Sequence, residues 1–248
     1  MLTTKKQARI LVVFFLLALS VGGWGGCSPA GVRALRKGEK LLKEGKYPEA
    51  VEKFEEATRA YPNSAKAWND LGLGYQYAGD VKKSVQAYRQ ALTLDRNLTA
   101  ASYNLGSLYL EQHQVNAAVT EFTTFVQLEP KNAQGWFKLG MAQTSQAASF
   151  VGAERNRWFD AAKKSLETAQ KLQPSAETLN ALGLLQMQRG RPQEAVSFFT
   201  SALQQQADYA PAVLNLAVVY QQHLNDHRQA LIHYQQFLKI AGNAPEKA

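Results

Sequence analysis

The most constraining feature of this sequence is a repeat with a period of 34 residues. The dipeptides Leu71-Gly72, Leu105-Gly106 and Leu139-Gly140 follow one another at that interval, and Leu182-Gly183 comes 43 residues later. A fixed period of this length predicts a solenoid, in which each unit buries its apolar face only against its neighbours. A generic helical bundle would not produce such a recurrence. A series of small residues keeps the same spacing: Ala50, Ser84, Ala118, Ala161, Ala195 and, one residue late, Ala230.

Each period has the pattern of two amphipathic helices joined by a turn. In the second period, Leu71 and Tyr75 recur at helical spacing, and a second helical stretch follows the turn signal Gly79-Asp80. Glycine tolerates the backbone angles at a helix end, and aspartate caps the helix that follows. Gly72 in the first helix and Ser84 in the second are small, so the two backbones are expected to approach closely there.

These residues resemble the tetratricopeptide repeat family, whose Trp, Leu-Gly, Tyr, Ala, Phe, Ala, Pro pattern recurs here. The second period keeps the pattern as Trp68, Leu71-Gly72, Tyr75, Ser84, Tyr88 and Ala91, and the third as Leu105-Gly106, Tyr109, Ala118, Phe122 and Pro130. The resemblance implies an all-α fold, a right-handed α-solenoid of about six helix-turn-helix units. The expected units are 31–64, 65–98, 99–132, 133–175, 176–209 and 210–242, followed by a loose tail, 243–248.

The first 26 residues have the pattern of a secretory signal peptide. Three basic residues precede an apolar run, Ile10 to Leu19, which is shorter than the roughly 20 residues of a membrane-spanning helix. Gly25-Gly26-Cys27 resembles the lipobox of bacterial lipoproteins, with Trp24 in place of the usual aliphatic residue. The resemblance implies that residues 1–26 are removed, that Cys27 carries a lipid, and that 27–30 form the attachment site and a short linker. The alternative is a secreted or inner-membrane-anchored protein whose cysteine is incidental.

The net charge bears on the class of partner, and the cysteine content bears on how the fold is stabilised. Removal of residues 1–26 leaves a net charge of +5, because that segment holds three of the 28 basic residues and none of the 20 acidic ones. No basic tract interleaved with aromatic residues stands out, so nucleic acid is not an expected partner. Cys27 is the only cysteine, so an intrachain disulfide is impossible and stability must come from packing.

The sequence offers little material for catalysis. It has no glycine-rich phosphate loop, no HExxH and no GxSxG, and no catalytic residue, metal or cofactor is expected. His223 and His227 have the spacing of two metal ligands on one helix face. The residues between them, Leu224 to Asp226, instead resemble an inter-helix turn, which would place both histidines in solvent. A metal-dependent enzyme using this pair remains the alternative from a different class.

The family resemblance also locates a candidate partner-binding groove. In tetratricopeptide solenoids the first helix of each unit lines the concave side, and the side chains implied there are mostly apolar or amide-bearing. Such a groove suits an amphipathic helix or an extended apolar peptide, although these residues would also suit packing between neighbouring units. Asn69 and Leu73 stand where chaperone-binding members use Lys and Asn, so a clamp for a terminal carboxylate is not expected. The candidates are Asn69, Leu73, Tyr77, Tyr103, Ser107, Phe137, Met141, Asn180, Leu184, Leu214 and Val218.

Two further surfaces are candidates. The fourth unit contains an insertion at 146–157, beside the apolar residues Phe150, Val151, Trp158 and Phe159. We expect the insertion to lengthen both helices so that these side chains cover each other; the alternative is a projecting apolar surface for a partner. The second surface is a basic stripe at helical spacing close to Cys27, which either faces anionic lipid headgroups or is simply solvated. It consists of Arg33, Arg36, Lys37 and Lys40.

Together these features predict a non-enzymatic scaffold of the bacterial cell envelope. Ser28 after the cysteine follows the lipoprotein sorting rule for the outer membrane, with the repeats facing the periplasm. A six-unit tetratricopeptide lipoprotein resembles the pilotins of type IV pilus assembly, which implies a secretin as the partner. An adaptor for cell-wall hydrolases or synthases is the alternative. The sequence does not name the partner or the oligomeric state, because the repeat pattern records packing.

Overall fold

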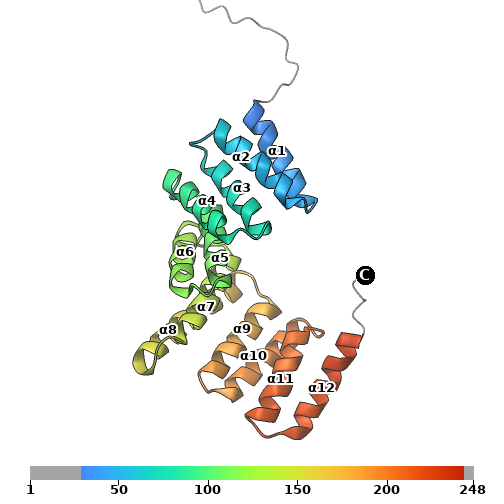
Figure 1. The fold of residues 1–248 in the computed structure, drawn as a ribbon. Helices are drawn as coiled ribbons and strands as arrows, with labels where there is room; N and C mark the ends of the chain where they lie inside the picture. Colours follow the sequence, from blue (N-terminus) through green and yellow to red (C-terminus); the bar gives the residue numbers. More distant parts are fainter. Residues whose placement is uncertain (1–28, 243–248) are drawn as a thin grey trace, which may run out of the picture.

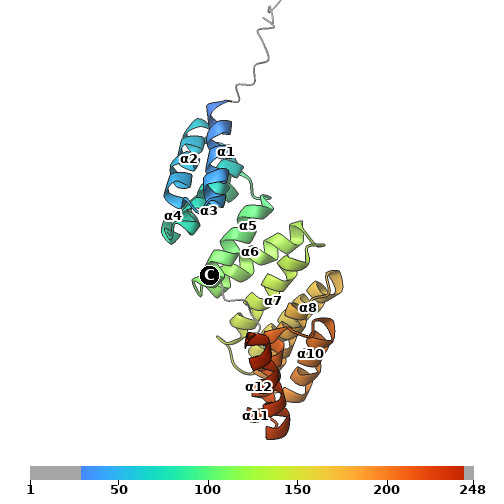
Figure 2. The ribbon, with the colours of Figure 1, turned by 90° about the vertical axis from the view of Figure 1, so that its right-hand side faces the viewer.

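The structure, a computed structural model, describes residues 29–242, which contain twelve helices and no strand. The signal-like segment, Cys27 and the tail 243–248 lie outside the described residues. The helices form six successive pairs in an elongated, curved array, with α1 and α2 at one end and α11 and α12 at the other (Figures 1 and 2). The predicted all-α solenoid is therefore confirmed. The helices are α1 (Ala30–Lys43), α2 (Tyr47–Ala60), α3 (Ala65–Tyr77), α4 (Val81–Leu94), α5 (Thr99–Glu111), α6 (Val115–Leu128), α7 (Ala133–Ala147), α8 (Gly152–Leu172), α9 (Ala176–Gln188), α10 (Pro192–Gln205), α11 (Ala210–Gln222) and α12 (His227–Gly242).

The pattern of helix contacts explains the curvature. Each helix contacts the next one along the chain, and each first helix also contacts the first helix of the following unit. Among the described residues, the second helices of successive units do not meet. The first helices are therefore closer together and line the inner side of the curve, whereas the second helices spread along the outer side. None of the described helices has the length and hydropathy needed to span a membrane.

The two helices of a unit pack through glycine on one side and a large side chain on the other. A Cβ atom added at Gly72 in α3 would lie only 2.6 Å from the ring of Tyr88 in α4. That ring is completely buried, so it fills the space that a glycine side chain leaves empty. Glycine in a helix costs about 1 kcal/mol relative to alanine, and this packing offsets the cost.

The turn between the helices of a unit uses one residue with a positive φ angle. Gly79 takes this position in the second unit with φ of +81°, and the Asp80 side chain then accepts a 3.1 Å hydrogen bond from the backbone N–H of Lys83. In the third unit His113 occupies the same position with φ of 55°, although it is not glycine. Asn225 has φ of 54° in the last unit. The predicted turn is confirmed, and it explains where His113 lies.

The fourth unit differs because both of its helices are longer. α7 has 15 residues and α8 has 21, compared with 13 and 14 in the second unit. Phe150 stacks on Trp158 with ring centroids 6.1 Å apart, and Phe159 is buried, as expected if the extension covers its own apolar side chains. Val151 at the tip remains 84% exposed.

The lengthened hairpin of the fourth unit also shifts the buried small residue by one position from the one predicted. Ala162 is fully buried, whereas Ala161 is half-buried. Leu166 accordingly lies against Gly140, as Tyr88 lies against Gly72. The hairpin is one residue longer than the repeat spacing indicates, and the connection to α9 is shorter by one. Because these two changes in length cancel, the spacing between successive Leu-Gly pairs does not reveal them.

Candidate partner-binding surface

Three of the predicted groove residues are buried between units. Each of them is the fifth residue of a first helix, and the exposed fractions are 7% for Asn69, 9% for Phe137 and 8% for Asn180. Phe137 packs in a core cluster with Phe159 and Leu182. These three positions therefore offer little surface to a partner, and the competing interpretation of packing between units describes them better.

The two buried asparagines have a structural role that the repeat spacing alone did not reveal. The Asn104 amide nitrogen donates a 3.2 Å hydrogen bond to Oδ1 of Asn69, and the Asn215 amide nitrogen donates a 2.8 Å bond to Oδ1 of Asn180. Both pairs join the fifth residue of one first helix to the sixth residue of the next. The signal in the sequence was two pairs of asparagines, each 35 residues apart.

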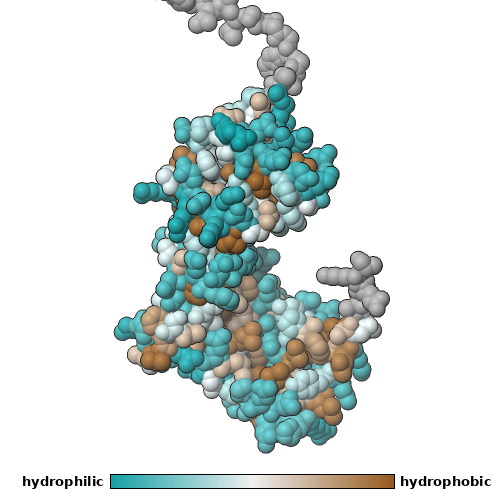
Figure 3. All heavy atoms as spheres, viewed as in Figure 1, coloured by the Kyte–Doolittle hydropathy of each residue, from teal (hydrophilic) through white to brown (hydrophobic). Residues whose placement is uncertain are grey.

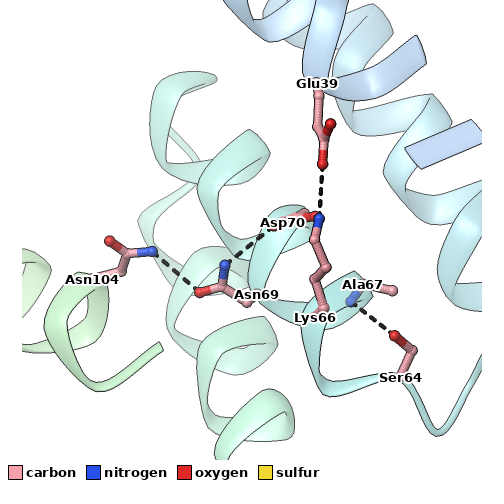
Figure 4. Close-up of polar contacts among 7 residues, drawn as sticks. All are labelled: Glu39, Ser64, Lys66, Ala67, Asn69, Asp70 and Asn104. Carbon is pink, nitrogen blue, oxygen red and sulfur yellow. Dashed lines mark hydrogen bonds and ion pairs between the residues drawn. The ribbon is translucent and has the colours of Figure 1, made fainter. Parts of the chain in front are cut away.

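The first of these pairs belongs to a polar chain across the first three units (Figure 4). The Lys66 ammonium bonds to Asp70 of its own helix and, at 2.7 Å, to Glu39 of α1. The Asn69 amide donates a 3.2 Å bond to Asp70 and connects onward to Asn104. Desolvation lowers the pKa of Lys66, but the two carboxylates outweigh it, so the pKa is raised above its ordinary value. These contacts connect α1, α3 and α5 on their inner sides.

The remaining groove candidates include the two large apolar residues that are exposed on the described first helices. Tyr77 is 55% exposed and Leu184 is 38% exposed. Ser107 differs from them, because its hydroxyl oxygen is buried and has no hydrogen-bond partner within the described residues. The half-buried candidates are Leu73, Tyr103, Met141, Leu214 and Val218.

Tyr103 borders a depression on the described part of the chain. The depression has a volume of about 430 Å³ and lies between α5, the end of α6 and the start of α7. The Tyr103 ring packs against Phe125 with centroids 5.2 Å apart, which fixes one wall. The lining combines aromatic, amide and carboxylate groups: Thr99, Ala100, Tyr103, Asn104, Phe125, Glu129, Asn132 and Gln134.

The basic stripe lies on the end face of the array. Three of its residues are exposed on α1: Arg33, Lys37 and Lys40. The residues 34 positions later, Ala67, Leu71 and Gly74, are all buried in α3. Gly74 packs against Phe54 of the preceding unit's second helix, so these positions form the face that each later first helix turns toward the unit before it. Basic side chains at these positions of α1 disfavour the packing of another unit against it, because the charges would have to be buried. Arg36 is also exposed, and Lys40 lies 3.7 Å from Glu44.

The two histidines of the alternative metal site lie on different helices. His223 caps the end of α11, and His227 is the first residue of α12. Within residues 29–242, no group of three or more His, Cys, Asp or Glu side chains is placed to hold a metal ion.

The family follows from comparison with known proteins. A family model described as tetratricopeptide repeat matches residues 35–101, 103–148 and 151–211, and a second model of the same description matches 186–246. The chain belongs to the tetratricopeptide repeat family. The fold of this family is that of a scaffold for binding peptides and proteins. The predicted resemblance is therefore confirmed at the level of the repeat.

Solved structures of tetratricopeptide repeat proteins share the fold at low identity. PilF of Pseudomonas aeruginosa is 18% identical with a TM-score of 0.66, covering 87% of this chain and 93% of that chain. A tetratricopeptide repeat protein from Parabacteroides merdae is 15% identical with a TM-score of 0.72, covering 85% and 79%. YrrB, described as having an unusual peptide-binding site, is 19% identical with a TM-score of 0.58, covering 78% and 95%.

Curated relatives are larger proteins that contain a similar stretch. The human protein O-mannosyl-transferase TMTC3 is 28% identical over 180 residues, which are 72% of this chain and 19% of that protein. The mouse DnaJ homolog subfamily C member 3 is 24% identical over 248 residues, or 94% of this chain and 48% of that protein. The chain spans about a fifth of the length of the first two relatives it matches.

Proposed function

We propose that this chain is a non-enzymatic scaffold of the bacterial cell envelope that holds an amphipathic helix or an extended apolar peptide of another envelope protein on its inner side. One observation carries the proposal. The first helices converge on that side and leave accessible apolar residues on it, notably Tyr77 and Leu184, and Tyr103 of α5 borders a depression. Aromatic and aliphatic side chains already held by a rigid scaffold bury large area on binding at small entropic cost.

The proposed partner is a secretin subunit of the type IV pilus machinery. Support comes from the resemblance of a six-unit tetratricopeptide lipoprotein to pilotins, and the likeness to PilF is one of fold. Envelope co-purification tests the partner class. Recovery of a secretin subunit supports the proposal, whereas recovery of a cell-wall hydrolase or synthase in its place favours the adaptor alternative.

The inner side is tested by replacing two of its exposed residues. The double variant Tyr77→Ser and Leu184→Ser should reduce secretin recovery by about fivefold or more, as expected for loss of two apolar anchors. Val151→Ser is the control, because Val151 is exposed in the α7–α8 connection and is not a residue of any first helix. Unchanged recovery with the double variant, or equal loss with the control, would assign binding to another surface.

Envelope attachment through Cys27 is a separate part of the proposal. Metabolic labelling with a fatty-acid analogue should mark the wild-type chain and leave Cys27→Ala unlabelled. Equal labelling of the two chains would refute the lipid site. We place the outer membrane as the destination, facing the periplasm, on the strength of Ser28.

The basic stripe is proposed to contact anionic headgroups beside the lipid. Each basic residue near an anionic surface contributes about 1 kcal/mol. The unlipidated chain should bind vesicles containing an anionic lipid better than neutral vesicles, and reversal of Arg33, Arg36, Lys37 and Lys40 to glutamate should remove the difference. Binding that is indifferent to anionic lipid content would leave the stripe a solvated end face.

A further inference from the structure

The two ends of the array present different side chains. The α1 end is basic, whereas α12 has apolar residues at positions that are covered by the next helix in internal units. In internal units one stripe of the second helix meets the next first helix. In α4 this stripe contains Val85, Arg89 and Leu92, and Arg89 Nε donates a 2.9 Å hydrogen bond to the hydroxyl oxygen of Tyr109 in α5. In α10 the stripe contains Val196 and Leu203, which pack in a core cluster with residues of α11.

The same stripe is apolar in α12 but is not covered by any described residue. Leu231 and Leu238 lie 35 residues after Val196 and Leu203, because the last turn contains one extra residue. Leu231 is 58% exposed and Leu238 is 68% exposed, whereas Val196 and Leu203 are half-buried. Apolar residues gather over α11 and α12 in the space-filling view (Figure 3).

The charged residues beside this stripe indicate what kind of helix could bind to it. Arg228 and Lys239 are exposed near its two ends, and α12 contains no acidic residue. Within the described residues neither of the two makes an ion pair. Asp226, just before the helix, accepts a 3.0 Å bond from the backbone N–H of Gln229 and so caps α12. An occupant with acidic side chains beside an apolar face would therefore match this surface.

A second copy of this chain matches it poorly. The start of another copy presents Arg33, Lys37 and Lys40, and burying these cations against leucine would be costly. Two α12 helices packed antiparallel would bring Arg228 of each copy toward Lys239 of the other, which places like charges together. The distribution of charge therefore disfavours both modes of self-association.

We infer that the exposed stripe of α12, Leu231, Gln235 and Leu238, docks an amphipathic helix with acidic flanks from another protein, which extends the solenoid as the first helix of a seventh unit would. The internal unit interfaces of this chain supply the geometry. This surface is distinct from the inner side, so its test is independent of the proposed function.

The experiment measures binding of a defined peptide to the full chain by fluorescence anisotropy. The probe is a stapled helix that keeps the α11 residues buried toward the preceding unit, Ala212, Leu216 and Val219, and carries glutamate at its other exposed positions. Its matched control peptide carries lysine at those positions. We expect micromolar binding of the glutamate peptide, weakened by salt, and about tenfold weaker binding of the lysine peptide.

Variants of the chain decide the outcome. Leu238→Glu should weaken the glutamate peptide by about tenfold or more, and Arg228→Glu with Lys239→Glu should reverse the preference toward the lysine peptide. Thr120→Glu, at an exposed position of α6, is the control and should leave the affinity unchanged, with circular dichroism showing that each variant is folded. Equal binding to Leu238→Glu would overturn the proposal. So would a dimer in sedimentation velocity that Leu238→Glu dissociates, because the occupant would then be a second copy.

Discussion

The Ser84 hydroxyl donates a 2.8 Å hydrogen bond to the carbonyl oxygen of Gly72 and so joins the two helices of the second unit. Ser84 is fully buried, so this bond satisfies a hydroxyl that has no access to water. The expected close approach at these two small residues is confirmed. The five other units have alanine where the second has Ser84, which shows that the contact requires a small side chain more than a hydroxyl.

The glycines of the first helices differ in how closely the second helix covers them, which gives a graded prediction. Gly72→Ala would place a Cβ atom 2.6 Å from the Tyr88 ring, whereas in Gly106→Ala the nearest ring atom of Phe122 would be 3.1 Å away. Alanine gains about 1 kcal/mol in helix propensity, and overpacking costs about 1–3 kcal/mol. Gly72→Ala should lower the free energy of unfolding by about 1 kcal/mol in urea titrations, and Gly106→Ala should be close to neutral. Equal effects would contradict the packing described here.

Two glutamines at the same repeat position should respond in opposite ways to replacement by methionine. Gln186 in α9 is fully buried, and neither atom of its side-chain amide has a partner within the described residues. Gln143 in α7 accepts a 2.7 Å bond from the Ser165 hydroxyl. Removing an unsatisfied buried amide relieves a desolvation cost, so Gln186→Met should raise the unfolding free energy by about 1–2 kcal/mol.

Gln143→Met is the control for that substitution. It leaves the Ser165 hydroxyl without its acceptor and should lower the unfolding free energy by about 1 kcal/mol. Thermal unfolding followed by circular dichroism measures both changes. A loss of stability in both variants would mean that the Gln186 amide is satisfied.

The turn at His113 predicts a stabilising substitution. A left-handed backbone costs a residue with a Cβ atom about 1–2 kcal/mol, and glycine avoids most of this cost. His113→Gly should therefore raise the free energy of unfolding by about 0.5–1 kcal/mol. His223→Gly serves as the comparison, because φ of −119° at His223 gives glycine no such advantage. A chain that is destabilised by His113→Gly would contradict the turn conformation.

Glu121 in α6 gives a prediction for pH dependence. Burial raises the pKa of the Glu121 carboxyl above its ordinary value of 4.5, and the nearby Arg89 guanidinium opposes the shift. A raised pKa in the folded state means that stability is highest below the unfolded pKa and is lost as pH rises through the folded pKa. Glu121→Gln should therefore raise the Tm at pH 7, and the gain should disappear as the pH falls to about 4. A gain that is the same at pH 4 and pH 7 would show that ionisation of Glu121 is not its source.

Much of the fold followed from periodicity because the repeat unit is local. Leu71-Gly72, the turn at Gly79 and the helix that carries Ser84 lie within one unit, and each feature has a signal in its own sequence window. The lengthened fourth unit was recognisable from the 43-residue spacing. Its internal shift, which buries Ala162 in place of Ala161, was hidden because the extra residue in the hairpin is offset by a shorter connection to α9.

The candidate surface was less predictable because exposure depends on the rotation between units. Asn69, Phe137 and Asn180, the fifth residues of three first helices, are buried against a neighbouring unit, whereas Tyr103 at the same position of α5 is half-buried. The sequence of a single unit does not fix how closely its neighbour approaches. The unpartnered face at Leu231 and Leu238 was not anticipated either. Those leucines resemble core residues until the structure shows that no described element follows them.

We propose that the inner side of the curve, formed by the first helices, binds the partner. Photo-crosslinking in living cells of the native host tests this proposal, with a photoreactive amino acid placed singly at Tyr103 or Leu184 on the first helices, or at Thr120 or Ser197 on the second helices. All of these positions have accessible surface. Binding on the inner side should give an adduct of one common mass from the two inner positions and none from the two outer positions. An adduct of that mass from Thr120 or Ser197, with none from Tyr103 and Leu184, would contradict it.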